Sequence, residues 1–287
     1  MTTELIASPR VMQERADRER HAGKRIALVP TMGFLHEGHL SLMREARRRS
    51  DWLVVSLFVN PTQFGPNEDY ARYPRDLEAD IARMETVPVD VVFAPAAEAM
   101  YPSGAQTWVE VGPIASGLCG ARRPGHFRGV ATVVAKLFNI VKPHLAFFGE
   151  KDFQQLRVIE RMAADLNFDV AIAAMPIVRE ADGLAMSSRN AYLSPSERAS
   201  ALALSRALAA ARELKARRVH DAAELRAAAA SVLAREPGLS VEYVEAVDAE
   251  TLESPVADGR PVLLAIAARV GTTRLIDNAV FPFSAPA

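Results

Sequence analysis

Cysteine is nearly absent from this chain: the only one, Cys119, excludes an internal disulfide and any metal site built from several cysteines. Long apolar runs are missing as well, and none approaches the ~20 residues that span a bilayer. Residues 1–10 lack the basic and then apolar layout of a secretory signal. We therefore expect a soluble cytoplasmic protein without a membrane partner, in which Cys119 is a buried or partly buried thiol.

The chain also lacks an excess of positive charge, since 34 Lys and Arg stand against 35 Asp and Glu and the net charge is −1. A nucleic-acid binder normally carries a basic surface, so we expect no nucleic-acid partner. What the chain does have is length and apolar content. Its 287 residues, 49% of them hydrophobic, suffice for one large domain or two smaller ones, each with its own core.

Apolar runs of strand length alternate with amphipathic helical stretches over roughly the first 180 residues, which is typical of a parallel sheet covered on both faces. We predict an α/β fold with a Rossmann-like, doubly wound parallel sheet. The expected strands are 26–29, 52–59, 89–94, 145–148 and 170–176. The expected helices are 40–49, 77–85, 130–141 and 152–166.

The composition changes after Leu193, where Ser194 and Pro195 have the form of a helix start. Alanine-rich helices are expected to about Arg217 and over 222–235. Strands are expected over 241–247, 261–268 and 273–280, two of them close enough in sequence to form an antiparallel pair. We predict two domains, a Rossmann-like one over 1–180 and a smaller C-terminal α+β domain over 181–287.

The segment 30–39, PTMGFLHEGH, is the most informative stretch, because it follows a strand-like run and opens a helix-like one. It sets His36 and His39 where backbone N–H groups and the positive end of a helix dipole face a ligand, usually an anionic phosphate. Gly33 and Gly38 let the backbone approach that ligand closely. The pattern indicates a nucleotide site, and the alternative is a glycine turn with two solvated histidines.

A second cluster lies in the segment 147–156, FFGEKDFQQL, again a strand, a glycine turn and a helix. Lys151 at the helix start would place an ammonium group beside bound phosphates, and Gln155, one turn further, can point to the same place. The carboxyl ends of parallel strands lie at one edge of a sheet. We therefore expect three segments at the same edge: this turn, the segment 60–63, and the segment 30–39, called the histidine turn below. The alternative for this cluster alone is a solvated surface turn.

A third cluster lies in the segment 178–190, VREADGLAMSSRN. Ser187 and Ser188 can donate hydrogen bonds to a phosphate, and the planar fork of Arg189 can hold two of its oxygens. On its own, Ser-Ser-Arg is a common loop tripeptide. Together with the histidine turn it is similar to the nucleotidyltransferase superfamily that includes class I aminoacyl-tRNA synthetases, where a Lys-Met-Ser-Lys-Ser loop takes this place.

Six segments carry a more specific resemblance: 29–39, 58–64, 73–75, 125–130, 148–155 and 179–192. In their order and spacing they resemble the pantoate–β-alanine ligase (pantothenate synthetase) family. The resemblance extends over about residues 25–195, and the C-terminal third matches only in kind, as a small lid of helices and antiparallel strands.

The resemblance implies an ATP-dependent condensation of (R)-pantoate with β-alanine through a pantoyl-adenylate, giving pantothenate, AMP and pyrophosphate. A carboxylate resists attack by an amine because it would have to expel oxide, so adenylation first supplies a leaving group. Displacement at phosphorus needs positioning and neutralisation of charge, which the basic groups and Mg²⁺ would supply. A homodimer is also implied.

Carried over residue by residue, the resemblance assigns charge stabilisation during catalysis to His36, His39, Lys151, Ser187, Ser188 and Arg189. It assigns pantoate binding to Gln63 and Gln155, whose neutral amides orient the acid without quenching it, and it implies that Gln63 also meets β-alanine. The residues implied to line ATP are Met32, Gly33, Phe34, Leu35, His36, Glu37, Gly38, His39, Gly149, Glu150, Lys151, Asp152, Val178, Met186, Ser187, Ser188 and Arg189. Four further residues are candidates for the site with weaker support, called second-rank residues below: Asn60, Tyr73, Arg123 and His126.

The metal ligands stay open: Asp80 would hold Mg²⁺ through water, whereas acidic residues at a helix start, such as Asp76 and Asp80, commonly complement the helix dipole.

The stretch 64–74 has residues typical of turns and no apolar periodicity. We predict that it forms a loop that covers pantoate and keeps water from the adenylate. Two other classes of function remain as alternatives: a nucleotidyltransferase that transfers AMP or CMP to a phosphate, and a non-catalytic nucleotide sensor. The sequence supports a tRNA ligase less well than either of these.

Overall fold

The computed structural model describes residues 3–66, 68–216 and 221–282. The chain forms two compact units, and two short segments that interrupt the first unit in the sequence belong to the second. The first unit comprises Met1–Ala115, Arg123–Glu150 and Gln155–Pro176. The second comprises Ser116–Arg122, Lys151–Gln154 and Ile177–Ala287.

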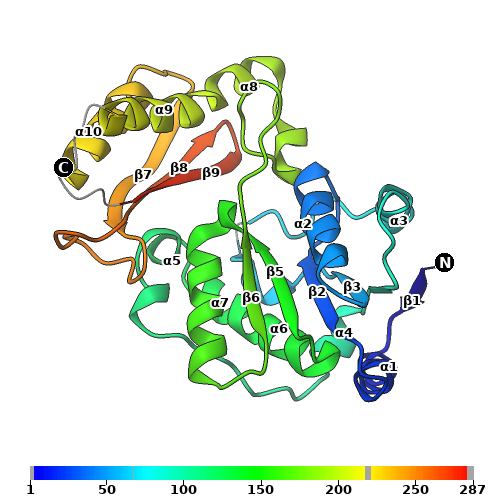
Figure 1. Ribbon diagram of the computed structural model, residues 1–287. Helices are drawn as coiled ribbons and strands as arrows, with labels where there is room; N and C mark the ends of the chain where they lie inside the picture. The colour runs from blue at the N-terminus through cyan, green and yellow to red at the C-terminus, as the bar shows by residue number, and fades with distance from the viewer. Residues whose placement is uncertain (1–2, 67, 217–220, 283–287) are drawn as a thin grey trace. The chain divides into compact units, whose positions relative to one another are not determined.

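A six-stranded, wholly parallel sheet forms the centre of the first unit, in the order β1-β4-β3-β2-β5-β6 (Figure 1). The doubly wound α/β fold is therefore confirmed. All five predicted strands are present, and the added edge strand β1 was not predicted. The strands are β1 (Glu4–Ile6), β2 (Ile26–Thr31), β3 (Trp52–Leu57), β4 (Val91–Phe93), β5 (Leu145–Gly149) and β6 (Ala171–Met175).

The four predicted helices are present in the predicted order, as α2, α3, α6 and α7, and two of them start earlier than predicted. The helices α1 and α4 were not predicted. The predicted starts at 40 and 130 were late, because His36 and Gly125 occupy the positions before the helices. The bounds are α1 (Pro9–His21), α2 (Glu37–Arg48), α3 (Leu77–Met84), α4 (Ala97–Met100), α6 (His126–Val141) and α7 (Phe153–Asp165), with the 3-10 turns η1 (Pro61–Gln63), η2 (Pro113–Ala115) and η3 (Glu150–Asp152).

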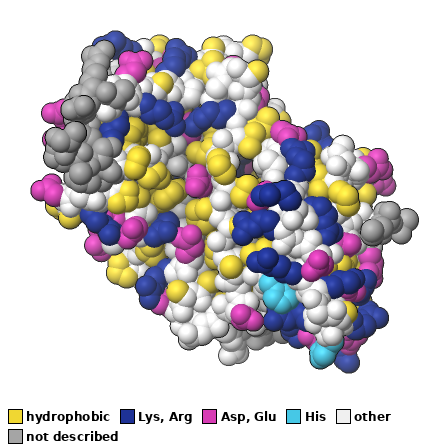
Figure 2. Space-filling view, in the orientation of Figure 1, with side chains coloured by type: hydrophobic (Ala, Val, Ile, Leu, Met, Phe, Trp, Pro, Cys, Tyr) yellow, Lys and Arg dark blue, Asp and Glu magenta, His cyan; other side chains and the backbone are white. Residues whose placement is uncertain are grey.

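Successive side chains of a strand point to opposite faces of this sheet, and along β2, β3, β4 and β5 both faces are buried. Ala27 and Val29 of β2 pack with Leu42 and Met43 of α2 on one face, whereas Leu28 belongs to the other. Figure 2 shows Lys and Arg side chains gathered over the region of α2. The arginines of α2 form ion pairs with Glu37, Asp90 and Glu45, so the positive charge here is balanced locally.

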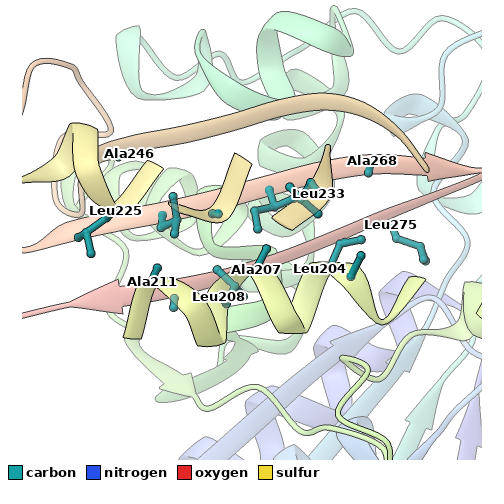
Figure 3. Close-up of a cluster of buried hydrophobic side chains, with 14 of the residues drawn as sticks. Leu204, Ala207, Leu208, Ala211, Leu225, Leu233, Ala246, Ala268 and Leu275 are labelled. Carbon is teal, nitrogen blue, oxygen red and sulfur yellow. The ribbon is translucent and has the colours of Figure 1, made fainter. Parts of the chain in front are cut away.

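The second unit is built on a three-stranded antiparallel sheet, in the order β7-β8-β9. All three strands were predicted, and the predicted antiparallel pair is β8 with β9. Figure 3 shows the apolar cluster that α9, α10 and this sheet share, in which Leu204, Leu208 and Leu225 are at most 1% exposed. The bounds are α5 (Leu118–Arg122), η4 (Ser188–Tyr192), α8 (Pro195–Ala201), α9 (Ala203–Ala216), α10 (Ala222–Leu233), β7 (Leu239–Asp248), β8 (Val262–Val270) and β9 (Thr273–Phe281).

The helix start predicted at Ser194 is confirmed: its hydroxyl accepts from the Glu197 amide, and the Glu197 carboxylate accepts from the Ser194 amide. The predicted end of the first alanine-rich helix, Arg217, lies outside the described residues. Cys119 is 9% exposed and forms no disulfide, as expected.

Candidate active site

Three polar turns of the first unit leave neighbouring parallel strands at the same edge of the sheet. The histidine turn follows β2, the Asn60–Gln63 turn follows β3, and Gly149–Glu150 ends β5. Thr31 and Leu57 are register partners, so the first two turns start level with each other. Carboxyl ends of parallel strands are the usual place for a ligand in such sheets.

The histidine turn begins with backbone in the left-handed region, at Gly33 with φ +84° and Phe34 with φ +50°. His36 then takes the N-cap position of α2, and its amide donates to Nδ1 of His39 at 3.3 Å. The two ring centroids are 4.0 Å apart. Because Nδ1 of His39 accepts, the neutral ring carries its proton on Nε2, which makes Nε2 a donor.

Asp80 of α3 holds this turn, a role that the sequence did not reveal. The side chain is 4% exposed, and its two oxygens accept from the amides of Phe34 at 2.8 Å and Leu35 at 2.7 Å. Burial raises the pKa of the Asp80 carboxyl, although both amide hydrogen bonds oppose the rise. A Cβ on Gly33 would stand 2.9 Å from Asp80 Oδ2, so glycine is needed there for space as well as for its φ.

The Asn60–Gln63 turn contains a chain of hydrogen bonds that orients the Gln63 amide. The Tyr101 hydroxyl donates to Asn60 Oδ1 at 2.9 Å, and Thr62 Oγ1 donates to the same oxygen at 2.9 Å. Asn60 Nδ2 therefore faces Gln63 Oε1, at 3.0 Å. The amino group of Gln63 donates to the Met32 sulfur at 3.3 Å, which leaves its second N–H for another acceptor.

Gly129 of α6 lets this helix lie against the Asn60–Gln63 turn, since a Cβ there would come within 2.4 Å of the Thr62 carbonyl oxygen. His126, on the same helix, contacts the Gln63 carbonyl oxygen through Nδ1 at 2.8 Å. Arg123 donates to that oxygen as well, at 3.2 Å. The second-rank residues His126 and Arg123 thus stabilise the turn through the backbone carbonyl of Gln63.

Arg123 also fixes the stretch that follows the turn, because its fork donates to both oxygens of Glu68 at 2.6 Å. Burial raises the pKa of Glu68, but the hydrogen bond and charge of Arg123 outweigh it and the pKa is lowered. Tyr73, another second-rank residue, packs edge-on against Phe64 at 5.9 Å between ring centroids. Of the predicted loop over 64–74, Asn67 lies outside the described residues.

The two adjacent glutamines of α7 differ in their use. Gln154, in the second unit, is 6% exposed; its Oε1 accepts from the Cys119 amide at 2.9 Å, and its Nε2 donates to the Gly117 carbonyl at 2.9 Å. Gln155, in the first unit, is partly exposed, and its side-chain amide forms no hydrogen bond with the described residues. Only Gln155 therefore has its amide available for a ligand, as its assignment requires.

In the second unit, the segment that leads to the serine–arginine cluster is a small hairpin. Arg179 and Ala185 form an isolated antiparallel bridge, and the Met186 amide donates to the Val178 carbonyl at 2.9 Å. Asn190 Nδ2 fastens its end, donating to Glu180 Oε1 at 2.6 Å and to Ala185 O. The carbonyl of Val178, a residue implied to line ATP, thus already accepts one hydrogen bond.

The serine–arginine cluster itself enters the 3-10 turn η4. Ser187 is its N-cap, and the hydroxyl accepts from the Arg189 amide at 3.3 Å. Ser188 is 8% exposed, whereas Ser187 and Arg189 are half-buried. The hydroxyl of Ser187 and the Arg189 side chain are therefore the more accessible groups of the cluster.

The predicted site residues divide between the two units. The first unit holds Met32, Gly33, Phe34, Leu35, His36, Glu37, Gly38, His39, Gln63, Gly149, Glu150 and Gln155. The second holds Lys151, Asp152, Val178, Met186, Ser187, Ser188 and Arg189.

Among the described residues, no group of three or more His, Cys, Asp or Glu side chains is placed to hold a metal ion. Asp80, expected to hold Mg²⁺ through water, is 4% exposed, and each of its oxygens accepts from one backbone amide. Over the same residues, no helix is both long and apolar enough to cross a bilayer.

A Rossmann-like sheet with a His-x-Gly-His turn at its carboxyl edge defines a nucleotide-binding α/β protein. The profile of the pantoate–β-alanine ligase family matches residues 4–280, nearly the whole chain. The chain therefore belongs to the pantoate–β-alanine ligase family, and the predicted ligase class and reaction are confirmed at that level.

Relatives and solved structures agree with this assignment. A pantothenate synthetase of Geobacter sulfurreducens is 60% identical over 276 residues, 96% of this chain and 98% of the relative. The crystal structure of pantothenate synthetase from Thermus thermophilus superposes with a TM-score of 0.89 at 47% identity, over 96% of this chain and 99% of the other. The ligase of Francisella tularensis, solved with β-γ ATP and β-alanine, gives 0.78 at 33% identity, over 97% and 98%.

Proposed function

We propose that this chain condenses (R)-pantoate with β-alanine in two steps at the carboxyl edge of its parallel sheet. In the first, a pantoate carboxylate oxygen bonds to the α-phosphorus of ATP and the bond from that phosphorus to the bridging oxygen breaks, releasing pyrophosphate. In the second, the β-alanine amine attacks the acyl carbon of the pantoyl-adenylate, AMP leaves, and the amine gives up a proton. The observation that carries the proposal is the level placement of the histidine and Asn60–Gln63 turns on neighbouring strands.

The histidine turn supplies charge stabilisation at phosphorus. His36 and His39 stand at the N-terminus of α2, where amide groups and the helix dipole favour an anion. The proton on Nε2 of His39 can be donated in a hydrogen bond to a phosphate oxygen as negative charge builds there. We assign His39 a stabilising role and no obligatory proton transfer.

Pantoate is held by the amides of Gln63 and Gln155. The hydrogen-bond chain from Tyr101 through Asn60 leaves the Gln63 amino group as donor, which suits a carboxylate or hydroxyl oxygen of the substrate. A neutral donor orients the carboxylate while preserving its nucleophilicity. Replacing either glutamine with glutamate should therefore weaken pantoate binding.

The family resemblance assigns further groups for the triphosphate to Lys151 and to the cluster Ser187, Ser188 and Arg189, all of which belong to the second unit. An ammonium, two hydroxyls and a guanidinium are suited to phosphate oxygens. Mg²⁺ would be bound chiefly by ATP itself, since the described residues offer no acidic cage and Mg²⁺ commonly enters with substrate phosphates. When bound, it would neutralise phosphate charge.

The assignment of 1–180 to ATP and pantoate binding and of 181–287 to a C-terminal lid remains part of this proposal. Segments 116–122 and 151–154 belong to the second unit, so that unit contains residues from both sides of position 180. We also propose a cytoplasmic homodimer, as the family resemblance implies. Sedimentation of the purified chain would test the oligomeric state.

Pyrophosphate exchange into ATP, assayed with and without pantoate, tests the reaction. The parent should exchange only when pantoate is present, and His39→Ala, Lys151→Ala and Gln155→Ala should each reduce exchange strongly. Release of AMP should then depend on β-alanine. ATP binding without pantoate-dependent exchange would instead indicate a nucleotide sensor, and transfer of AMP to a phosphate acceptor would indicate a nucleotidyltransferase.

A further inference from the structure

Two adjacent polar residues lie buried in the middle of β9, Asp277 at 2% exposure and Asn278 at 6%. Burying a carboxylate and an amide in a strand is costly unless both are hydrogen-bonded. Both are, and their partners lie far away in the sequence. The partners are the segments that carry the proposed ATP-binding residues of the second unit.

Asp277 forms a two-bond ion pair with Arg179, at 2.7 Å from Nη1 and 2.9 Å from Nη2. Nη1 of Arg179 also donates to the Gly183 carbonyl at 3.1 Å, so the guanidinium closes the hairpin on itself. Met186 pairs with Val178 in the same hairpin and leads directly into the serine–arginine cluster. The carboxylate of Asp277 thus fixes the base of the segment that carries Ser187.

Asn278 acts on a different segment. Its Nδ2 donates to the Lys151 carbonyl oxygen at 2.9 Å, across 127 positions of sequence. Successive side chains of a strand point to opposite faces, so Asp277 lies on the face of Leu275 and Ala279, and Asn278 lies on the other. One strand therefore contacts the Lys151 turn from one face and the Arg179 hairpin from the other.

We propose that Asp277 and Asn278 are positioning residues, which set the Lys151 turn and the Ser187–Arg189 cluster at a fixed spacing for one triphosphate. The inference rests on the proposed function for the identity of that ligand. Neither residue needs to touch ATP. Displacing a phosphate-binding group by about 1 Å can lower a rate about a hundredfold.

The main test is Asn278→Leu, which keeps the size of the side chain and removes its donor, with Asp277→Asn as the second variant. ATP and pantoate dissociation constants are measured directly by calorimetry, and pyrophosphate exchange is measured separately. We expect Asn278→Leu to weaken ATP binding and lower exchange about tenfold or more. Pantoate affinity should stay unchanged, because the pantoate amides belong to the first unit.

A double-mutant cycle separates positioning from general loss of structure. If Asn278 acts through Lys151, adding Asn278→Leu to Lys151→Ala should change ATP affinity less than twofold. Leu275→Val, on the same strand, is the matched control, since it loosens the apolar cluster and should lower the melting temperature without altering ATP affinity. If Asn278→Leu does not fold, Asn278→Ser replaces it.

The inference is overturned if folded Asn278→Leu and Asp277→Asn bind ATP like the parent, or if the loss persists in full in the Lys151→Ala background. A similar loss of ATP affinity in Leu275→Val would also overturn it. These outcomes differ from failure of the proposed function, which would appear as a parent that binds ATP and lacks pantoate-dependent exchange. The ATP affinities would still decide the inference in that case.

Discussion

Two buried aspartates, one in each unit, hold functional turns by different means. Asp80 accepts hydrogen bonds from two backbone amides, and no side-chain identity at Phe34 or Leu35 is needed for that. Asp277 pairs with a guanidinium, so its contact depends on arginine at position 179. The first turn is thus fixed by backbone geometry, and the hairpin of the second unit is fixed by charge.

The difference shows in what each segment tolerates. The histidine turn should fail when its backbone or the space beside Asp80 changes. The hairpin should fail when a charged partner is removed. The following predictions test this contrast, in order of decreasing expected effect.

Gly33→Ala should have the largest effect, because the new Cβ would meet Asp80 Oδ2 at 2.9 Å and the residue has φ +84°. We expect pyrophosphate exchange to fall about a hundredfold as the histidine turn moves. Gly23→Ala is the matched control, since Gly23 has φ +76° and nothing within 4 Å of a Cβ. It should lose about 1 kcal/mol of stability and keep its exchange rate. Equal losses of exchange in both variants would contradict the prediction.

Arg123→Gln should release the stretch after Phe64, because the two hydrogen bonds of its fork to Glu68 are lost. If this stretch shields the adenylate, AMP release without β-alanine should rise several-fold, about 1 kcal/mol in relative rates. Glu68→Gln should act in the same direction through the same contact. Deletion of the loop tip should do so more strongly, and unchanged AMP release in all three would count against the covering role.

Tyr101→Phe should weaken pantoate binding about fivefold, since one buried hydrogen bond of about 1 kcal/mol sets the orientation of Asn60 and thereby of Gln63. The KM for ATP should not change. Tyr243→Phe, in the second unit, is the control: it also loses a hydroxyl, one near Arg274, and should leave the KM for pantoate unaltered. Steady-state kinetics with each substrate varied would decide, and an equal rise in both KM values for Tyr101→Phe would sink the idea.

The smallest effect concerns pH and compares Asp80 with Asp248. The Arg260 hydrogen bond lowers the pKa of Asp248 from 3.8 to about 2, so this carboxylate stabilises the fold above pH 3.8 and the contribution is lost as the pH falls through about 2. Asp248→Asn should therefore be less stable than the parent at neutral pH, and the deficit should shrink over that range.

Asp80 should behave in the opposite way. Burial raises its pKa, so its ionised form costs stability above the raised pKa, and that cost disappears as the pH falls from the raised pKa to 3.8. The deficit of Asp80→Asn should then persist or grow on acidification. Urea unfolding at a series of pH values would measure both, and parallel pH profiles for the two variants would refute the contrast.

Much of the first unit was predictable because its signals are local. An apolar run such as Ile26–Thr31 reads as a strand wherever it lies, and His36 and His39 mark the strand-to-helix turn by spacing alone. The short edge strand Glu4–Ile6 was missed because three residues carry too little pattern. The starts of α2 and α6 were placed late, since polar residues in a first turn hide the apolar period.

The supporting residues of the site were not predictable to the same degree. Asp80 looked like one of two acids at a helix start, and only the fold shows that Asp76 caps α3 while Asp80 reaches back to Phe34. Gln154 and Gln155 are indistinguishable in sequence, yet one is consumed by backbone contacts. Asn278 carried no signal, because its partner Lys151 is 127 positions away.

The sequence by itself determined the order of most strands and helices and the family, and it led to the proposed ligand class of the histidine turn. These depend on short-range periodicity, on helix-terminal electrostatics and on motifs whose members are close together. Only the tertiary structure decided which polar side chains orient the proposed substrate-binding groups, as Tyr101 orients Gln63 through Asn60. A hydrogen bond requires two groups within about 3 Å, and only the folded chain brings residues so distant in sequence to that separation.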